Sequence, residues 1–258
     1  MTMLTTQDKQ SALCELRRHI SFLDGAQNGE RRLEPVCGDQ LAPAFFAHGL
    51  HEIVGETPAD RAAAAAFALI AAGYGAKSKQ ALLFAAPDRE GRETGWLYGA
   101  GLDRLGVDPA SLVLVRAPSE KALLWTAEEA ASCRALAAAI IVLGRHQKLY
   151  GFTASRRLKL RQEKSGTPLF IVRPRTGEAS AATMRWRVMF APTEGLRVPG
   201  SLVPLPGRPR FRVFLERYGG AAPLQWEVEL DEAHALRVVA AVSDRPALTP
   251  RFNNQSAA

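Results

Sequence analysis

The fold is decided by the stretch Gly49-Leu-His-Glu-Ile-Val-Gly-Glu-Thr-Pro-Ala-Asp-Arg-Ala-Ala-Ala-Ala-Ala-Phe67. It begins as a short apolar strand, passes through a tight turn and continues as a long alanine-rich helix. The first backbone N–H groups of a helix have no partner within the helix, so this arrangement presents them to an anion. It is the local geometry of a phosphate-binding loop. We therefore expect the rest of the chain to be organised around this junction.

The phosphate-binding motif G-x-x-x-x-G-K-[ST] is incomplete here. Counting from Gly55, its last three positions hold Asp60, Arg61 and Ala62. Asp60 places a carboxylate where phosphate would lie, and two like charges about 4 Å apart repel by roughly 1 kcal/mol in water and about 4 kcal/mol near a protein surface. Arg61 carries its charge on a broad fork, and Ala62 has no hydroxyl for Mg²⁺. The sequence therefore predicts a retained scaffold without nucleotide chemistry, cofactor or metal.

The composition is typical of a soluble globular protein. The chain has 258 residues, 47% of them apolar and 23% charged, which suits one or two domains with a large core. It has no run of about 18 apolar residues, so we expect no membrane span. The polar N-terminus lacks a signal-peptide pattern, and three widely spaced cysteines favour reduced, buried thiols in a cytoplasmic protein.

The net charge of +7 is unevenly distributed. Residues 1–144 carry 14 basic and 17 acidic side chains, residues 145–212 carry 15 and 3, and residues 213–258 carry 4 and 6. The three segments therefore have net charges of −3, +12 and −2. A basic block between acidic flanks is typical of a surface that binds nucleic acid or an acidic partner.

Predicted strands and helices alternate through the first part of the chain. Helices are expected at 62–72, 92–105 and 119–135, and buried strands at 81–86, 112–115 and 137–143. Continuous apolar strands separated by helices predict a parallel sheet that is covered on both faces.

Beyond Leu143 the pattern changes. It predicts a basic helix at 153–166, a strand at 169–172 and three strands with period-two alternation at 184–190, 211–215 and 224–230. We expect these last three strands to be antiparallel with one solvated face, and Arg185 and Arg187 to share a face opposite Trp186. The predicted fold class is α/β, with a mainly parallel central sheet flanked by helices and antiparallel strands added toward the C-terminus.

The predicted domain organisation has three parts. Residues 1–40 form an N-terminal helix and linker, residues 41–240 form the core domain, and residues 241–258 form a flexible tail. The apolar stripe of the helix at 11–24 favours packing on its own domain, and it leaves open an arm that docks on a neighbour.

Short motifs in a fixed order resemble two related protein families. The RecA core is similar in order and spacing to Tyr98-Gly-Ala-Gly-Leu-Asp-Arg-Leu-Gly-Val-Asp108, Leu112-Val-Leu-Val115, Ala127-Glu-Glu-Ala130 and Ile140-Ile-Val142. The closer resemblance is to ImuA, the RecA-like family of bacterial mutagenesis cassettes. It is carried by Leu50-His-Glu-Ile53, Phe67-Ala-Leu, Glu93-Thr-Gly-Trp-Leu-Tyr98, Ser155-Arg-Arg-Leu158, Ser165-Gly-Thr-Pro168 and Arg185-Trp-Arg-Val188, and it covers residues 13–230.

This resemblance implies a RecA-like core and a role in SOS-induced, error-prone translesion DNA synthesis. It implies work alongside ImuB, an inactive relative of Y-family polymerases, and an error-prone replicative-type polymerase, with RecA as a further partner. ATP-hydrolysing RecA proteins keep a Mg²⁺-coordinating aspartate where this chain has Leu143-Gly144, and a catalytic glutamate about where it has Asp88. We therefore expect no ATPase activity and no catalytic residue.

The basic block contains the candidate surface for a macromolecule. Arg157, Arg161 and Lys164 lie near one stripe of the helix at 153–166, which a merely solvated helix face would explain equally well. The functional alternative joins them to arginines of neighbouring strands, forming a positive surface for the phosphates of single-stranded DNA or for an acidic partner protein. The candidate residues are Arg156, Arg157, Arg161, Lys164, Arg173, Arg185 and Arg187.

Two other functions remain open from the sequence. The first is a residual ATP-binding switch in which Arg61 takes the place of the motif lysine. The second is SulA-like inhibition of cell division by a protein of similar scaffold.

Overall fold

A computed structural model describes residues 34–75, 80–175, 179–193, 195, 197, 205, 207–218 and 223–241. Its strands are β1 (Val36–Cys37), β2 (Gln40–Leu41), β3 (Leu50–Gly55), β4 (Ala81–Pro87), β5 (Leu112–Ala117), β6 (Leu136–Val142), β7 (Leu169–Arg173), β8 (Met184–Phe190), β9 (Arg210–Tyr218), β10 (Leu224–Leu230) and β11 (Leu236–Ala241). Its helices are α2 (Pro43–Phe46), α3 (Arg61–Gly75), α4 (Asp88–Thr94), α5 (Gly99–Arg104), α6 (Glu120–Ser132) and α7 (Phe152–Ser165), with 3-10 turns η1 (Pro58–Asp60) and η2 (Pro109–Ser111).

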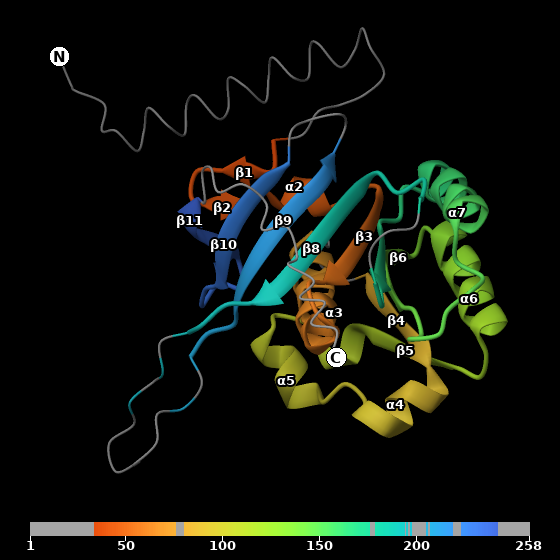
Figure 1. Ribbon diagram of the computed structural model, residues 1–258, viewed down its shortest axis with the longest axis horizontal. Coiled ribbons are helices and arrows are strands. Elements are labelled where there is room, and N and C mark those ends of the chain that lie inside the picture. The colour runs from red at the N-terminus through yellow and green to blue at the C-terminus, as the bar shows by residue number, and fades with distance from the viewer. Residues whose placement is uncertain are drawn as a thin grey trace, which may run out of the picture.

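One sheet contains all the described strands, in the order β1-β2-β11-β10-β9-β8-β3-β7-β6-β4-β5 (Figure 1). The strands from β5 to β8 in this order are parallel, and those from β9 to β1 continue in antiparallel pairs. The predicted α/β class, with mainly parallel central strands and antiparallel additions, is confirmed. The antiparallel arrangement expected among 184–190, 211–215 and 224–230 is confirmed, because β9 pairs antiparallel with both β8 and β10. On its other side β8 pairs in parallel with β3, so it joins the two halves of the sheet.

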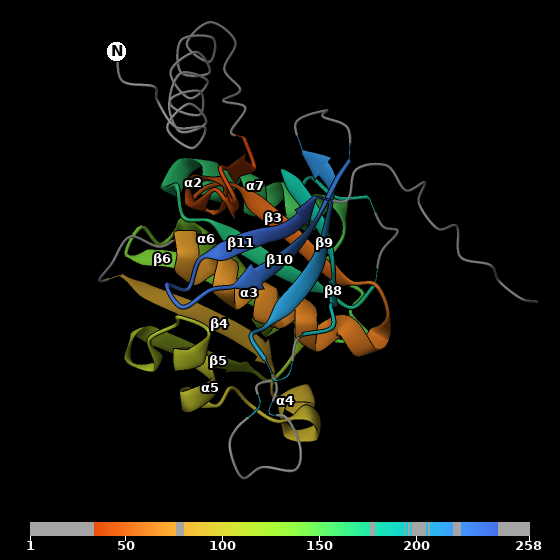
Figure 2. The ribbon, with the colours of Figure 1, turned by 90° about the vertical axis from the view of Figure 1, so that its left-hand side faces the viewer.

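Helices cover the two faces of the parallel strands. On one face α3 packs on β3, β6, β7 and β8, in a core that includes Phe67, Trp186 and Phe211. On the other face α6 packs on β4, β5 and β6 beside α7, in a core that includes Ile141 and Ile171 (Figure 1). The smaller helices α4 and α5 lie together at one end of the sheet, next to β4 and β5, in both views (Figures 1 and 2).

The single helix expected at 92–105 is instead two short helices, α4 and α5. The break begins at Gly95, whose φ of 91° is strained for any side chain. The following Trp96 folds back over α4, so that a Cβ on Gly91 would lie 2.2 Å from the indole ring. The periodicity of this segment was helical, but glycine geometry and the packing of one tryptophan divide it.

The edges of the sheet bear on the domain prediction. Residues 36–41 form β1 and β2 and join the sheet through β11, so ordered strands lie on both sides of the expected boundary at residue 41. The helix at 11–24 and the tail beyond residue 241 lie outside the described residues. Cys37 is exposed and Cys133 half-buried, and neither forms a disulfide, which corrects the expected burial of Cys37. No described helix is long and apolar enough to cross a membrane.

Candidate functional site

The turn between β3 and α3 has the strand–turn–helix geometry expected from the sequence. β3 ends at Gly55, η1 follows, and α3 begins at Arg61. The backbone doubles back so tightly that a Cβ on Gly55 would lie 2.7 Å from the backbone carbon of Asp60. Only glycine allows such a close approach without moving the backbone. Gly55 is therefore required by packing alone, with or without a ligand.

The carboxylate of Asp60 uses the hydrogen-bond donors of this turn. Its Oδ2 accepts from the Thr57 backbone N–H at 3.1 Å and from the Thr57 hydroxyl at 2.7 Å. The Glu56 N–H donates to the carbonyl of Val188 at 3.3 Å. An open anion-binding turn would offer such N–H groups to a ligand. Here Asp60 acts as an internal anion and closes the turn on itself.

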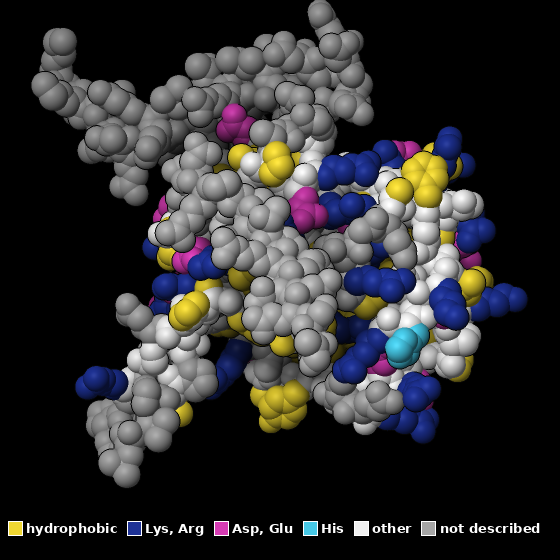
Figure 3. Space-filling view, viewed as in Figure 1, with side chains coloured by type: hydrophobic (Ala, Val, Ile, Leu, Met, Phe, Trp, Pro, Cys, Tyr) yellow, Lys and Arg dark blue, Asp and Glu magenta, His cyan; other side chains and the backbone are white. Residues whose placement is uncertain are grey.

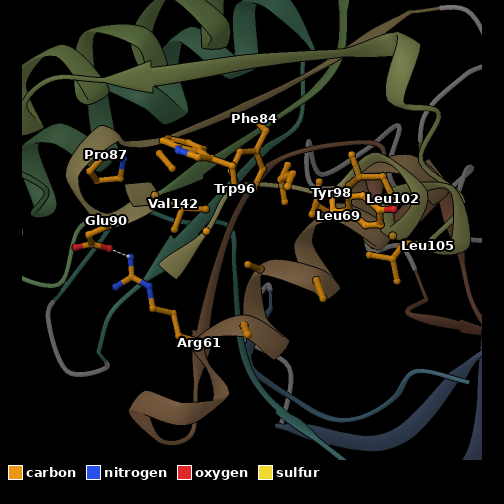
Figure 4. Close-up of a pocket in the computed structure, with 18 of the residues that line it drawn as sticks. Arg61, Leu69, Phe84, Pro87, Glu90, Trp96, Tyr98, Leu102, Leu105 and Val142 are labelled. Carbon is orange, nitrogen blue, oxygen red and sulfur yellow. Dashed lines mark hydrogen bonds and ion pairs between the residues drawn. The ribbon is translucent and has the colours of Figure 1, made fainter. Parts of the chain in front are cut away.

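Arg61, at the position of the motif lysine, is held by the protein. Its Nη2 lies 2.6 Å from Glu90 Oε2 (Figure 4). The same nitrogen also donates to the carbonyl oxygen of Leu143, just after β6. Burial lowers the pKa of Arg61, and the Glu90 carboxylate opposes that shift. Glu90 also accepts from the backbone N–H of Arg145. The guanidinium thus links the start of α3 to the carboxyl ends of β4 and β6.

Glu90 is a site residue that sequence reasoning missed. The sequence pointed to Asp88 instead. The Asp88 carboxylate pairs with Arg92 at 2.6 Å and with Arg116 at 3.0 Å. A usable signal was present, because Glu90 lies in the first turn of the helix that follows β4. In a parallel sheet that position lies at the same edge as the β3–α3 turn.

A cavity of about 680 Å³ lies beside Arg61, between α3, the end of β4 and the segment from Gly95 to Leu105. Its walls are mostly apolar, formed by residues that include Ala62, Ala65, Ala66, Leu69, Phe84, Trp96, Leu97 and Leu102. Charged residues line it as well, namely Arg61, Glu90, Arg104 and Arg145. No motif pointed to this cavity, because its walls come from segments that meet only in the folded chain.

The basic helix expected at 153–166 is α7, which carries Arg156, Arg157, Arg161 and Lys164. We call these four residues the α7 basic face. Arg157 and Arg161 both pair with Glu128 of α6, at 2.8 and 3.0 Å. Arg156 and Lys164 are exposed. Figure 3 shows Lys and Arg side chains gathered over this part of the molecule.

Arg173 does not belong to that surface. Its side chain is only 3% exposed, and its Nη1 lies 3.0 Å from Oε2 of Glu52, which is itself 1% exposed. Arg185, on β8, pairs with the same oxygen at 3.2 Å, and the hydroxyl of Tyr150 donates to the other at 2.7 Å. Burial and the Glu52 carboxylate raise the pKa of Tyr150 well above its ordinary value, which keeps that hydroxyl protonated. The expected surface role is corrected: Arg173 and Arg185 neutralise a buried carboxylate.

Arg187 is also engaged within the protein. It pairs with Glu56 at 3.0 Å and with Glu216 at 2.9 Å, and its guanidinium lies 4.8 Å from the centre of the Phe214 ring. Two more cross-strand pairs follow on the same open face of the sheet, Arg210 with Glu229 at 2.6 Å and Arg212 with Glu227 at 2.7 Å. The face is charge-paired, so the predicted positive surface does not continue across β8 and β9.

Arg173, Arg185 and Arg187 are thus engaged in ion pairs within the sheet, and the structure separates the remaining candidate residues into two places. Gly55, Asp60, Arg61 and Ala62 meet at the β3–α3 turn and its cavity, while the α7 basic face lies on an outer helix of the opposite layer. Among the described residues, no group of three or more His, Cys, Asp or Glu side chains is placed to hold a metal ion.

Comparisons with known proteins give one consistent relationship. No protein-family model matches the chain. The chain is similar to the Protein ImuA of Caulobacter vibrioides, from strain NA1000 / CB15N and from strain ATCC 19089 / CIP 103742 / CB 15. In each case the identity is 31% over 217 residues, covering 76% of this chain and 82% of the relative.

Proposed function

The chain belongs to the ImuA family, and from this premise we propose that it is a non-enzymatic accessory protein in SOS-induced, error-prone translesion DNA synthesis. In this proposal it acts in the cytoplasm, where it recruits or stabilises partner proteins at damaged DNA. Those partners are an ImuB-like relative of Y-family polymerases and an error-prone replicative-type polymerase. RecA and single-stranded DNA are further partners.

A RecA-like core is part of this proposal. Its support is the parallel half of the sheet, with β3 near the middle and the carboxyl ends of β3, β4 and β6 at one edge. The β3–α3 turn lies at that edge, where open α/β sheets place their ligand sites.

The closed turn is the observation that carries the non-enzymatic proposal. A triphosphate needs free N–H donors and a free cation at this place. In this protein Asp60 takes the Thr57 donors, and Glu90 holds Arg61. An incoming phosphate would meet the Asp60 carboxylate first, and like charges repel there. The scaffold function then depends on the outer surface, which binds other macromolecules.

The α7 basic face is the surface that we assign to DNA. Exposed arginines bind phosphates without reading bases, and the resulting affinity falls steeply with salt. Arg156 and Lys164 are available at the surface, and Arg157 and Arg161 share one carboxylate between two guanidinium groups. The face thus keeps excess positive charge. An acidic partner protein would satisfy the same arginines.

Co-purification tests the scaffold proposal. The full chain is co-expressed with the ImuB-like protein and the polymerase of its own cassette, and complexes are isolated with and without Mg-ATP. We expect the complex to form equally well in both conditions. Failure to bind either protein in both conditions contradicts the proposal.

The residual ATP switch is separated from the scaffold by calorimetric titration. We expect no Mg-ATP binding up to millimolar concentration, because Asp60 occupies the Thr57 donors and Glu90 holds Arg61. Binding that Arg61→Ala abolishes would support the switch instead. Filamentation of cells that overexpress the chain, without any effect on mutagenesis, would favour the SulA-like alternative.

A further inference from the structure

The cavity beside the β3–α3 turn is shaped for a ligand of small-molecule size. Its volume of about 680 Å³ lies within the range of roughly 300–1,000 Å³ that is typical of small-molecule sites. The α3 wall is made of Ala62, Ala65 and Ala66, whose short side chains leave the space unfilled. Phe84 and Leu69 complete the apolar wall of the cavity.

Two buried hydrogen-bond donors at this cavity have no acceptor among the described residues, Arg61 Nη1 and Trp96 Nε1. Buried donors without partners are rare, because each one that has lost its water without gaining an acceptor destabilises the fold. Both residues line the cavity, and Figure 4 shows the Trp96 ring and the Arg61–Glu90 pair toward one end of it, with Leu102 and Leu105 toward the other.

Neither donor is free to turn away toward solvent. The Trp96 ring packs against Gly91, where a Cβ would lie 2.2 Å away, and the Arg116 guanidinium lies 4.7 Å from its centre. Arg61 is anchored through its other nitrogen, Nη2, to Glu90. The two unpaired N–H groups are therefore held in place at the polar end of an apolar cavity.

The charged residues that line the cavity determine which sign of ligand charge it favours. Three arginines and one glutamate line the cavity, so the formal charge of its lining is positive; they are Arg61, Arg104, Arg145 and Glu90. Asp60 takes the Thr57 backbone N–H of the turn, and its carboxylate disfavours a second or third phosphate nearby. A ligand with a compact polar head group that carries one negative charge fits these conditions.

We propose that the cavity binds a small amphipathic acid. Its apolar body, aromatic or aliphatic, lies against the alanine wall of α3 and Phe84. Its monoanionic head accepts hydrogen bonds from Arg61 Nη1 and Trp96 Nε1, while Nη2 of Arg61 stays on Glu90. This site is additional to the proposed scaffold function and requires neither DNA nor a partner protein.

The test uses the aromatic sulfonate 8-anilinonaphthalene-1-sulfonate as a fluorescent probe with the full chain. We expect saturable binding that naphthalene-1-carboxylate displaces and that neutral naphthalene-1-methanol displaces at least about tenfold less effectively, because the head bonds to a charged donor. Inorganic triphosphate should not compete. Equal displacement by the acid and the alcohol overturns the assignment of the head.

Matched variants locate the binding. Ala65→Phe fills the cavity and should weaken binding of the probe at least about tenfold. Ala100→Phe adds the same ring at an exposed position of α5 and should leave the affinity for the probe unchanged. Trp96→Phe removes the N–H together with part of the indole ring and should weaken binding about three- to tenfold. Circular dichroism and thermal melts confirm that each variant is folded. Probe affinity that Ala65→Phe leaves unchanged in a folded protein overturns the site.

Because the isolated chain is used, this result is independent of the scaffold proposal. If the protein binds the probe but none of the cassette proteins, the cavity assignment is supported and the proposed function is contradicted. A protein that binds the cassette proteins but not the probe gives the opposite result.

Discussion

The arginines of the fold interior and those of α7 have the same chemistry and different roles. Arg173 is 3% exposed and lies against a buried carboxylate, whereas Arg157 is 58% exposed and only shares one. A guanidinium that has left water must be paired or it destabilises the fold, whereas an exposed one adds little stability and remains available to bind. Burial thus decides which part of the basic block supports the structure and which part can act on a partner.

The largest effect expected from this contrast is at Arg173. Arg173→Ala leaves Glu52 buried with only Arg185 and Tyr150, so the free energy of unfolding should fall by about 3–5 kcal/mol. Urea denaturation at neutral pH measures it. The double variant Glu52→Leu with Arg173→Met removes this pair of buried charges and should recover part of the loss, because Tyr150 and Arg185 then lack their acceptor. A loss under about 1 kcal/mol in the single variant would show that the pair is not a structural requirement.

The next largest effect is a pH dependence of stability that comes from the face of β3 opposite to Glu52. His51 is fully buried, accepts from the Trp186 indole N–H at 3.2 Å and hydrogen-bonds to the His48 carbonyl at 2.8 Å. Burial lowers the pKa of His51 from 6.5 to about 4. The unfolded chain therefore binds the proton more readily, and stability present above pH 6.5 is lost as the pH falls toward 4.

This shift corresponds to roughly 3 kcal/mol at full protonation. Denaturant unfolding at pH 7 and near pH 4 measures it, with His51→Phe as the reference because carboxylates also titrate in this range. The variant should be less stable at neutral pH, since Trp186 loses its acceptor, and should show a weaker pH dependence. Equal dependence in both proteins would contradict a buried neutral His51.

A smaller effect is expected at the closed turn. Asp60→Ala removes the acceptor of the Thr57 N–H and hydroxyl and should cost about 1 kcal/mol, as the loss of a helix cap does. Asp60→Asn keeps an oxygen that can accept and should cost less than half as much. Thermal unfolding measures both variants. A melting temperature unchanged by Asp60→Ala would mean that the turn does not depend on its internal anion.

The smallest effect on stability, and the largest on binding, is expected on the α7 basic face. Arg157→Glu with Arg161→Glu should lower stability by only about 1 kcal/mol, because both side chains are substantially exposed. Affinity for single-stranded DNA should fall at least about tenfold at low salt, with a shallower salt dependence. Fluorescence anisotropy of a labelled oligonucleotide measures both.

The matched control makes the same charge change elsewhere. Arg208→Glu with Arg237→Glu alters exposed arginines that pair with Glu232 and Asp39 on the antiparallel side of the sheet. DNA affinity should change much less there. If both double variants bind alike, the face is assigned to a protein partner instead.

Much of the fold was predictable from local pattern. The β3–turn–α3 junction, the strands at 184–190 and 224–230 and the basic helix at 153–166 lie where the periodicity placed them, within a residue or two. The turn at Gly95 was missed because one tryptophan packing on Gly91 outweighs a helical pattern. The fates of Arg173 and Arg185 were missed for a similar reason. Alternating polar and apolar residues indicate that the two faces of a strand differ. They do not indicate whether a neighbouring strand carries a carboxylate that pairs with an arginine on one of those faces.

The sequence alone determined that the phosphate-binding motif is broken at Asp60, Arg61 and Ala62, because residue types settle which donors and hydroxyls exist. Only the tertiary structure decided what those residues do instead. Asp60 bonds locally, but Arg61 meets Glu90 across 29 positions of sequence, and Glu52 meets Arg173 across 121. Such pairs form because parallel strands bring their ends and neighbouring faces together, and that proximity depends on strand order, which no local stretch of sequence contains.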